Sequence, residues 1–417
     1  MAEEYGIAFD VGTTTIVGSL IELRSGREAG TVSLPNPQTE WGKDILERVK
    51  AIMEEPNLLP TLHGALIGAL QRIVTELRPT DGGGISGVTA VGNPAIEHIL
   101  MGRSPASLGK VPYRPLFKEP QRASAREVGL HGTEDGAWFY AFPLVSGFVG
   151  GDTVAVILST GMDKGTRPTL AIDIGTNSEM AVKTGKGLFV TSAAAGPAFE
   201  GGEVENGMVA EAGAIRSISI EGGKVHLDVI GGVAPKGICG SGLLNVVANL
   251  LHHGVIDSSG RVKGRDEIDG NLANRIREGE EGNSFILHKG AKGDIALTQG
   301  DIRAFQLAKS AIRAGITLAI ERAGVGPEEI EEVYIAGAFG SNLREEDLVA
   351  IGLLDERWVG RLNFLGDAAL DGAILALCSE EKREEAEGIA KRARYLSLSG
   401  SKHFQREFMK EINFVTP

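Results

Sequence analysis

The stretch GIAFDVGTTT, residues 6–15, returns in altered form as LAIDIGTNSE, residues 170–179. Each copy runs from small or apolar residues into an aspartate, one apolar residue, Gly-Thr, and further hydroxyl or amide side chains. The two aspartates, Asp10 and Asp173, lie 163 positions apart in a chain of 417 residues. A chain of this length favours two or more lobes over one core. The spacing therefore predicts one copy of the motif in each lobe.

The shared Asp-x-Gly-Thr pattern predicts an anion site at the tip of a strand-turn-strand unit. Glycine and threonine at such a tip present several backbone N–H groups in one direction, together with hydroxyl donors. Phosphate is the natural guest, and the preceding carboxylate suits a Mg²⁺ ion held largely through water. The alternative is a plain Asx-type turn with threonine present for its strand propensity. Two copies in the same context favour a pair of phosphate loops.

Composition excludes several classes of function. The net charge of −13 argues against a nucleic-acid surface, which needs a basic face. The sequence contains no run of about 18 apolar residues, so it predicts no membrane span. The N-terminal MAEEYG lacks the features of a signal peptide. The two cysteines, Cys239 and Cys378, exclude a disulfide framework and any cluster ligated by four thiolates of this chain. We expect a cytoplasmic protein.

Local patterns place the main elements around these two motifs. Residues 61–78 show helical spacing, and residues 151–161 are expected to form a buried helix that opens on glycines. A long helix is expected from Thr298, a candidate N-cap, to a stop at Gly324. We expect two domains, residues 1–165 and residues 166–417. Residues 103–137 show few periodic signals and are left unassigned.

The order of these motifs resembles the superfamily of actin, sugar kinases and heat-shock chaperone ATPases, called ASKHA. The resemblance implies an α/β fold of two lobes with duplicated mixed sheets, flanking helices and a nucleotide cleft between the lobes. It covers most of the chain and implies ATP and Mg²⁺ as cofactors. Asp10 and Asp173 would bind the metal, and Asp152 would position the attacking water. The alternative for Asp152 is an N-capping role at a helix start.

The same resemblance assigns the nucleotide-binding residues. The segment 199–203 is similar to a chaperone loop beside the ribose and phosphates, although a plain glycine turn is the alternative. The three polar residues on one face of the long helix resemble a chaperone motif that holds ribose and adenine, with a solvated polar stripe as the alternative. The expected nucleotide-binding residues are Gly12, Thr13, Thr14, Thr15, Gly175, Thr176, Asn177, Glu200, Gly201, Gly202, Gln306, Lys309, Arg313, Gly337, Gly340 and Ser341.

A narrower resemblance spans nearly the whole chain. NPQTEWGKDILERV (36–49), GNPAIEHILMG (92–102), PKGICGSGL (235–243) and DIRAFQLAKSAIRAG (301–315) look like the ATPase domain of the reductive activators of corrinoid proteins. This family implies that ATP drives the one-electron reduction of a corrinoid protein from Co(II) to Co(I). The Asn93-Pro94 turn departs from the hydroxyl-rich version of the family, which puts a role for Asn93 in doubt.

The family's electrons normally come through an iron–sulfur domain, and this chain has no cysteine-rich segment. We therefore expect no iron–sulfur cluster on this chain and a donor that acts in trans or from a missing domain. The expected partner is a corrinoid protein, with neither nucleic acid nor membrane; a homodimer is left open. The alternatives are a sugar-type kinase, a nucleotide-gated binding protein of the chaperone or filament type, and an activator of a radical dehydratase, which would need cluster-ligating cysteines.

Overall fold

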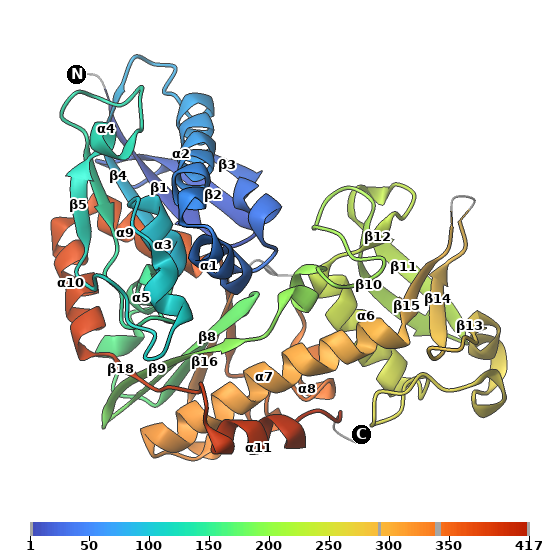
Figure 1. The fold of residues 1–417 in the computed structure, drawn as a ribbon. Helices are drawn as coiled ribbons and strands as arrows, with labels where there is room; N and C mark the ends of the chain where they lie inside the picture. Colours follow the sequence, from blue (N-terminus) through green and yellow to red (C-terminus); the bar gives the residue numbers. More distant parts are fainter. Residues whose placement is uncertain (1–2, 291–292, 338–342, 415–417) are drawn as a thin grey trace. The chain divides into compact units, whose positions relative to one another are not determined.

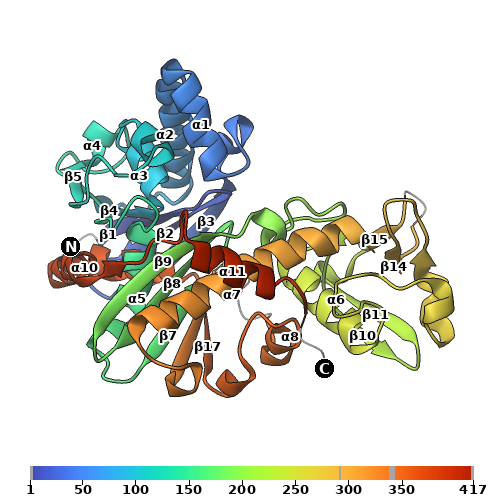
Figure 2. The ribbon, with the colours of Figure 1, turned by 60° about the horizontal axis from the view of Figure 1, so that its bottom comes forward.

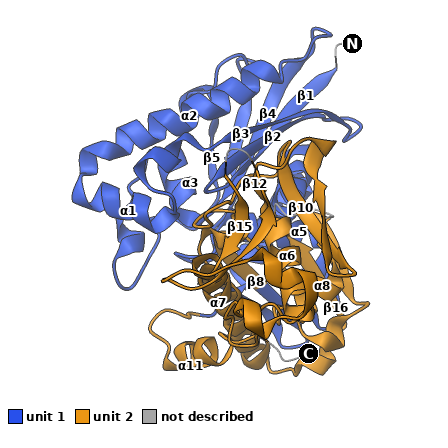
Figure 3. Cartoon of the chain, turned by 90° about the vertical axis from the view of Figure 1, so that its right-hand side faces the viewer, with its two compact units in different colours: residues 1–171, 181–191, 367–396 blue, residues 172–180, 192–366, 397–417 orange. Residues whose placement is uncertain are grey.

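The computed structural model describes residues 3–290, 293–337 and 343–414 (Figure 1). The chain forms two compact units, each assembled from several segments. Unit 1 comprises residues 1–171, 181–191 and 367–396, and unit 2 comprises residues 172–180, 192–366 and 397–417 (Figure 3). These units follow spatial packing rather than chain order, and the division at residue 165 stays a prediction.

Unit 1 contains a six-stranded mixed sheet with the strand order β3-β2-β1-β4-β6-β5. Strand β1 pairs antiparallel with β2 and parallel with β4, and the first Asp-x-Gly-Thr turn joins β1 to β2. The strands of this sheet are β1 (Glu4–Val11), β2 (Thr15–Glu22), β3 (Glu28–Pro35), β4 (Gly84–Gly92), β5 (Gln121–Ser124) and β6 (Trp138–Ala141).

Helices cover the unit 1 sheet because their apolar faces match it. On α2, the residues Leu62, Leu66, Leu70 and Ile73 follow the predicted helical spacing, and all four are buried in the unit 1 core. Burying each such side chain contributes about 2 kcal/mol. The helices of unit 1 are α1 (Ile45–Glu54), α2 (Leu59–Glu76), α3 (Pro94–Leu100), α4 (Ala125–Val128), α5 (Gly151–Thr160), α9 (Ala368–Cys378) and α10 (Glu380–Arg392).

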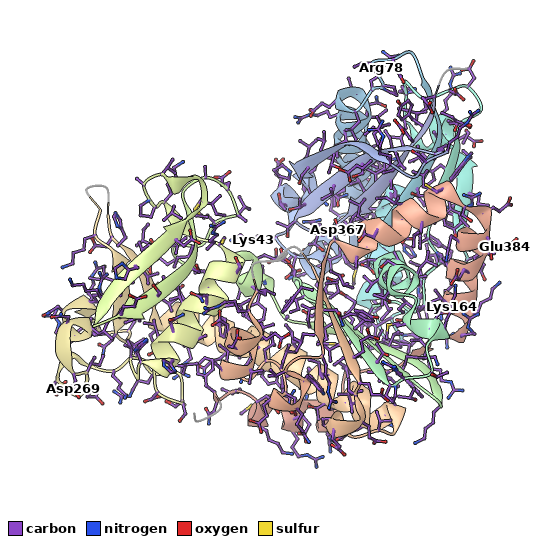
Figure 4. The ribbon with its side chains drawn as sticks, turned by 180° about the vertical axis from the view of Figure 1, so that it is seen from behind. Lys43, Arg78, Lys164, Asp269, Asp367 and Glu384 are labelled. Carbon is purple, nitrogen blue, oxygen red and sulfur yellow. The ribbon has the colours of Figure 1, made fainter. Side chains whose placement is uncertain are left out.

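Helix α9 packs against α5, β1 and β4. A Cβ atom at Gly372 of α9 would lie 2.2 Å from the carbonyl oxygen of Ala155 in α5, so glycine permits this close approach. The hydroxyl of Thr89 in β4 also donates to the carbonyl of Ala373 at 2.9 Å. The small residues near Asp367, which caps α9 (Figure 4), thus tie a late segment of the chain to the first sheet.

A second six-stranded sheet has the order β17-β16-β7-β8-β9-β18, and its residues are divided between the two units. The order β9-β8-β7-β16-β17 repeats the order β3-β2-β1-β4-β6 of the first sheet. In both, three strands that are consecutive in the chain are followed by two later ones. The second Asp-x-Gly-Thr turn joins β7 to β8, as the first joins β1 to β2. The strands are β7 (Thr169–Asp173), β8 (Asn177–Thr184), β9 (Gly187–Ala194), β16 (Glu332–Ala336), β17 (Leu362–Gly366) and β18 (Arg394–Tyr395).

In the described part of unit 2, the remaining residues form two three-stranded sheets and four α-helices, with short 3₁₀ turns between them. The sheets are β11-β10-β12 and β13-β14-β15. The bounds are β10 (Ala214–Glu221), β11 (Lys224–Val229), β12 (Gly237–Ile238), β13 (Ile276–Arg277), β14 (Ser284–His288), β15 (Ile295–Thr298), α6 (Gly240–His252), α7 (Gln299–Ala323), α8 (Glu345–Ala350) and α11 (Lys402–Lys410).

The long helix α7 begins and ends where the sequence predicts. Thr298 caps it in a capping box with Asp301, and Gly324 ends it in the left-handed conformation. Helix α11 packs alongside α7, as Figures 1 and 2 both show.

Residues 103–137, which the sequence left unassigned, contain a 3₁₀ turn, β5 and α4 before β6 begins. At the far end of α5, Lys164 lies beside α10 (Figure 4) and forms an ion pair with Glu385. Of the helices that the described residues form, none is long and apolar enough to cross a membrane.

Candidate nucleotide site

The first Asp-x-Gly-Thr turn lies at the end of β1 in unit 1. Asp10 pairs with Val17 and Val11 with Ile16 in the β1–β2 ladder, and the turn occupies residues 12–14. A Cβ atom at Gly12 would lie 2.7 Å from the carbonyl oxygen of Thr15, so only glycine fits without a shift of the backbone. The tight turn that the sequence predicts here is present.

Three consecutive carbonyl groups of this turn are held by two residues from outside it. The Asn36 side chain donates to the Gly12 carbonyl at 2.9 Å, and its backbone N–H donates to the Thr14 carbonyl at 2.8 Å. The Arg48 guanidinium donates to the Thr13 carbonyl at 2.6 Å. A turn fixed through its carbonyls keeps the orientation of its peptide N–H groups, which is what an anion site requires.

Arg48 brings a buried positive charge to this turn. Its side chain is fully buried, and it also donates to the carbonyl of Gly42 at 2.9 Å and to Gln38 at 3.3 Å. Burial lowers the pKa of Arg48 to about 10, which leaves it charged at neutral pH. Sequence reasoning included Arg48 in a family motif but gave it no role.

Asn93 has a structural role that the sequence left in doubt. Its side-chain oxygen accepts from the backbone N–H of Ile96 at 3.0 Å and caps α3. Its side-chain nitrogen donates to the hydroxyl of Thr13 at 3.2 Å. The start of α3 is therefore bonded to the first Asp-x-Gly-Thr turn.

Asp152 lies in the first turn of α5, also in unit 1. The cap residue of α5 is Gly150, so the N-capping alternative for Asp152 is wrong. Its carboxylate accepts from the backbone N–H of Thr153 at 2.6 Å. Burial raises the pKa of Asp152, while the bonds to Thr153 oppose that shift. A carboxylate with a raised pKa is suited to accept a proton.

The second Asp-x-Gly-Thr turn lies in unit 2 and already binds an anionic oxygen. Both the backbone N–H and the hydroxyl of Thr176 donate to one carboxylate oxygen of Glu200, at 2.5 Å and 2.7 Å. The carbonyl of Thr176 accepts from the N–H groups of Ala195 and Gly196. The loop thus presents two donors to a single negatively charged oxygen, as a phosphate site would.

The segment that carries Glu200 turns on glycines. Glu200 ends a 3₁₀ helix (Pro197–Glu200), and Gly201 follows in the left-handed conformation with a φ of 81°. The N–H of Gly202 donates to the carbonyl of Pro197 at 2.9 Å. The glycine turn is present, and Glu200 joins it to the second Asp-x-Gly-Thr turn; a place beside ribose and phosphates stays a prediction.

The start of the predicted adenosine loop packs against the second phosphate loop. Gly337 has a φ of +114°, and a Cβ atom there would lie 2.4 Å from the carbonyl oxygen of Ile174 and 3.1 Å from the Asp173 carboxylate. The N–H of Ile174 donates to the carbonyl of Ala336 at 3.1 Å. The other predicted residues of this loop, Gly340 and Ser341, lie outside the described residues.

On α7, Gln306 and Lys309 are occupied by other parts of unit 2. The Gln306 amide donates to the carbonyls of Ser259 at 3.1 Å and Ile412 at 2.9 Å, and the Lys309 ammonium donates to that of Asn413 at 2.7 Å. Both side chains are buried, so the alternative of a solvated polar stripe is wrong for them. Burial lowers the pKa of Lys309 to about 8.

Arg313, the third polar residue on this face of α7, forms an ion pair with Asp355 at 3.3 Å. Its guanidinium also lies over the Trp358 ring, 5.7 Å from the centroid. All three predicted α7 residues are therefore engaged by the chain itself in the described structure.

Comparisons with known proteins agree with the fold and the motifs. Two family models match in sequence order: the RACo middle region over residues 5–165, and the C-terminal domain of RACo, the ASKHA domain, over residues 167–416. The chain is 34% identical over 419 residues to the corrinoid activation enzyme RamQ of Eubacterium limosum, covering 98% of this chain and 70% of RamQ. It is 24% identical to the [Co(II) methylated amine-specific corrinoid protein] reductase of Methanosarcina barkeri, covering 99% of this chain and 77% of that protein.

A solved structure, the reductive activator for corrinoid, iron-sulfur protein, superposes with a TM-score of 0.90 at 34% identity. The match covers 99% of this chain and 66% of the activator, so the chain spans about two thirds of that protein. The predicted ASKHA fold, which implies nucleotide binding, is confirmed. The chain belongs to the RACo family, the reductive activators of corrinoid proteins.

Proposed function

We propose that this chain binds and hydrolyses ATP, and that it couples hydrolysis to the reduction of a partner corrinoid protein from Co(II) to Co(I). The names of the two curated relatives and of the solved activator support this proposal. The observation that carries it is the pair of donors of Thr176 on one carboxylate oxygen, because it supports a role of the second Asp-x-Gly-Thr turn in binding an anionic oxygen.

The proposed roles follow from where each side chain lies. Asp152 would orient and deprotonate the attacking water, because it is a carboxylate of raised pKa in the same unit as the first phosphate loop. Catalysis would consist of positioning and electrostatic stabilisation, as is usual for phosphoryl transfer. The β- and γ-phosphates would be held by Thr13, Thr14, Thr15, Thr176 and Asn177. The nucleoside side would be contacted by Gly201, Gly202, Gly337, Gly340 and Ser341. Glu200, Gln306, Lys309 and Arg313 are engaged by the chain itself, so each would have to leave its present partner before it could contact a nucleotide.

Asp10 and Asp173 would hold Mg²⁺, and their chemistry fits this ion. Mg²⁺ at nucleotide sites takes one or two carboxylates together with phosphate oxygens and water, rather than a cage of protein ligands. Among the described residues, no three His, Cys, Asp or Glu side chains gather into a metal cluster. When bound, Mg²⁺ would neutralise phosphate charge; the chain's own part is to place one carboxylate at the end of each strand.

The electrons would come from an iron–sulfur donor on another protein or another domain. Hydrolysis would change the affinity of this chain for two states of the corrinoid protein, since a conformational equilibrium shifts only when the two states bind differently.

The first experiment measures Mg²⁺-dependent ATP hydrolysis with and without a Co(II) corrinoid protein, in the presence of a low-potential reductant. We expect stimulation by the corrinoid protein and the optical appearance of Co(I). A panel of sugars and polyols run in parallel tests the kinase alternative. ATP consumption that follows a sugar rather than the corrinoid protein would contradict the proposal.

A variant test addresses the metal site. Asp10→Ala should lower Mg²⁺-dependent turnover by roughly a hundredfold or more while the protein stays folded, because it removes a carboxylate from the charge-neutralising centre. Asp135→Ala is the matched control in unit 1, because that aspartate is fully exposed. Unchanged turnover in Asp10→Ala would remove Asp10 from the mechanism.

A further inference from the structure

Glu97 is a buried carboxyl group for which the proposed mechanism has no use. It lies in the first turn of α3 and is fully buried. Neither carboxyl oxygen has a hydrogen-bond partner in the described part of the chain. The peptide N–H groups of Gly92 and Gly151 lie close enough to favour its charged form, but neither makes a well-formed hydrogen bond to it in the described structure. A buried polar group without partners is costly, so its retention calls for a physical reason.

The carboxyl of Glu97 is directed at the start of α5. A Cβ atom at Gly151, the first residue of α5, would lie 2.2 Å from Oε1 of Glu97 and 2.5 Å from the Cβ of Phe142. Only glycine at position 151 therefore lets the carboxyl reach this point. The next residue along α5 is Asp152, so the Glu97 carboxyl lies at the N-terminus of the helix that carries a second carboxyl group, where the helix dipole favours negative charge.

The two carboxyl groups interact through their charges, and Glu97 is fully buried, so both cannot ionise cheaply. Burial raises the pKa of Glu97 well above its usual value, and the charge of Asp152 raises it further. Burial also raises the pKa of Asp152, but its bonds to the N–H and hydroxyl of Thr153 favour its charged form. Glu97 has no such bonds, so a shared proton belongs on Glu97.

The other titratable groups near Glu97 do not compensate its charge. On β6, Tyr140 has its own pKa raised, chiefly by burial, and the charge of Glu97 adds to this shift. On α3, His98 is turned away: its ring nitrogens contact the carbonyl of Pro94 and the N–H of Leu116. On α2, His63 contacts the carbonyl of Ile99.

We propose that Glu97 and Asp152 form a carboxyl pair that carries one proton, held on Glu97, and that Glu97 is a positioning residue which acts through Asp152. The pair belongs to the surroundings of the first phosphate loop, because Asn93, at the start of the same α3, donates to Thr13. With the proton in place the pair carries one negative charge, on the group proposed to activate water. Loss of the proton would add a second charge where a triphosphate is expected. The role of Glu97 in catalysis rests on the proposed function, whereas the presence of one proton on the pair does not.

The first test measures thermal stability against pH in the nucleotide-free protein. A carboxyl whose pKa is raised in the folded state loses stability as pH rises from its unfolded value of about 4.5 toward its folded value. Glu97→Gln mimics the protonated form and removes that loss. We expect the Tm of Glu97→Gln relative to wild type to rise by about 2 °C or more between pH 5 and pH 9.

The controls separate the pair from a general effect of charge. Glu76→Gln, an exposed site at the end of α2, should show no such trend. In an Asp152→Asn background the trend for Glu97→Gln should shrink, because the neighbouring charge is gone. Should Glu97→Gln fail to fold, Asp152→Asn alone should flatten the pH dependence of wild type. A Tm difference that does not change with pH would overturn the shared proton.

The second test is the pH–rate profile of ATP hydrolysis. Wild type should lose activity on the alkaline side as Glu97 ionises, and in Glu97→Gln this loss should disappear or move upward by at least about one pH unit. An unchanged alkaline limb would overturn the positioning role. If neither protein hydrolysed ATP, the proposed function would fail, and the stability profiles would still decide the shared proton.

Discussion

The two Asp-x-Gly-Thr turns have nearly the same sequence, but the chain treats them differently. In the first turn, Asn36 and Arg48 donate hydrogen bonds to the three carbonyl groups of residues 12–14, so these bonds involve none of the turn's peptide N–H groups. In the second turn, the N–H and hydroxyl groups of Thr176 donate hydrogen bonds to the carboxylate of Glu200. The first turn is therefore preorganised, whereas under the proposed function the second would have to exchange a protein oxygen for a phosphate oxygen.

Two turns with the same motif can therefore contribute differently to the free energy of ligand binding. Preorganisation raises affinity because little is ordered on binding. An internal ligand lowers affinity, because its own bonds must be broken before the outside ligand binds.

The largest expected effect comes from removing the anchor of the first turn. Arg48→Met should lower the free energy of unfolding by about 3 kcal/mol, because two backbone carbonyls lose their partner inside the core. It should also weaken binding of a magnesium nucleotide by roughly tenfold through loss of preorganisation. Denaturant unfolding and calorimetric titration measure the two effects. Arg72→Met, exposed on α2, is the matched control, and equal effects in both variants would remove Arg48 from the comparison.

The next effect concerns the internal ligand of the second turn. Glu200→Gln replaces charge-assisted bonds by neutral ones, which are about half as strong. We expect a magnesium nucleotide to bind roughly tenfold more tightly, which corresponds to about 1.4 kcal/mol.

Glu203→Gln controls for the change in local charge, because that residue is exposed three positions further along the same loop. Weaker binding in Glu200→Gln would mean that the carboxylate serves the bound nucleotide rather than competing with it.

A third effect depends on pH and concerns Lys309 of α7, whose ammonium group, like the donors of the second turn, is bonded to another part of unit 2. The pKa of Lys309 is about 8 in the folded protein, against an ordinary value of 10.5. Between these values the unfolded chain binds the extra proton, so wild type gains stability as pH rises from about 8 to 10.5.

Lys309→Met should lack this gain, and the Tm difference between variant and wild type should change across that window. Lys402→Met, exposed on α11, is the control. A Tm difference that stays constant would mean that Lys309 keeps its proton in the folded state over this range, so that its pKa is not lowered.

Local signals in the sequence predicted the parts that depend on neighbours in the chain. The turns after Asp10 and Asp173 needed only a strand, a glycine and a hydroxyl residue. The ends of α7 needed only the capping box at Thr298 and the glycine at 324. The buried face of α2 followed from helical spacing.

The contacts that distinguish the two turns join residues far apart in the chain. Arg48 lies 35 positions from Thr13, and Glu200 lies 24 positions from Thr176. A buried arginine and a glutamate in a glycine loop have many other roles, so residue type and spacing could not assign these contacts. For the same reason the engagement of Lys309 by Asn413, 104 positions away, was not predictable.

The smallest effect tests how redundant the anchoring of the first turn is. Asn93→Ser keeps an oxygen that can cap α3 but is too short to bond Thr13, whereas Asn93→Ala loses both contacts. We expect Asn93→Ala to cost about 1 kcal/mol of stability, as is typical for a lost helix cap, and Asn93→Ser to cost less than about half of that. Nucleotide affinity should change less than about twofold in Asn93→Ser, because the carbonyl bonds from Asn36 and Arg48 remain. A larger loss of affinity in Asn93→Ser would show that the Thr13 hydroxyl, and not the backbone of the turn, is what the first site depends on.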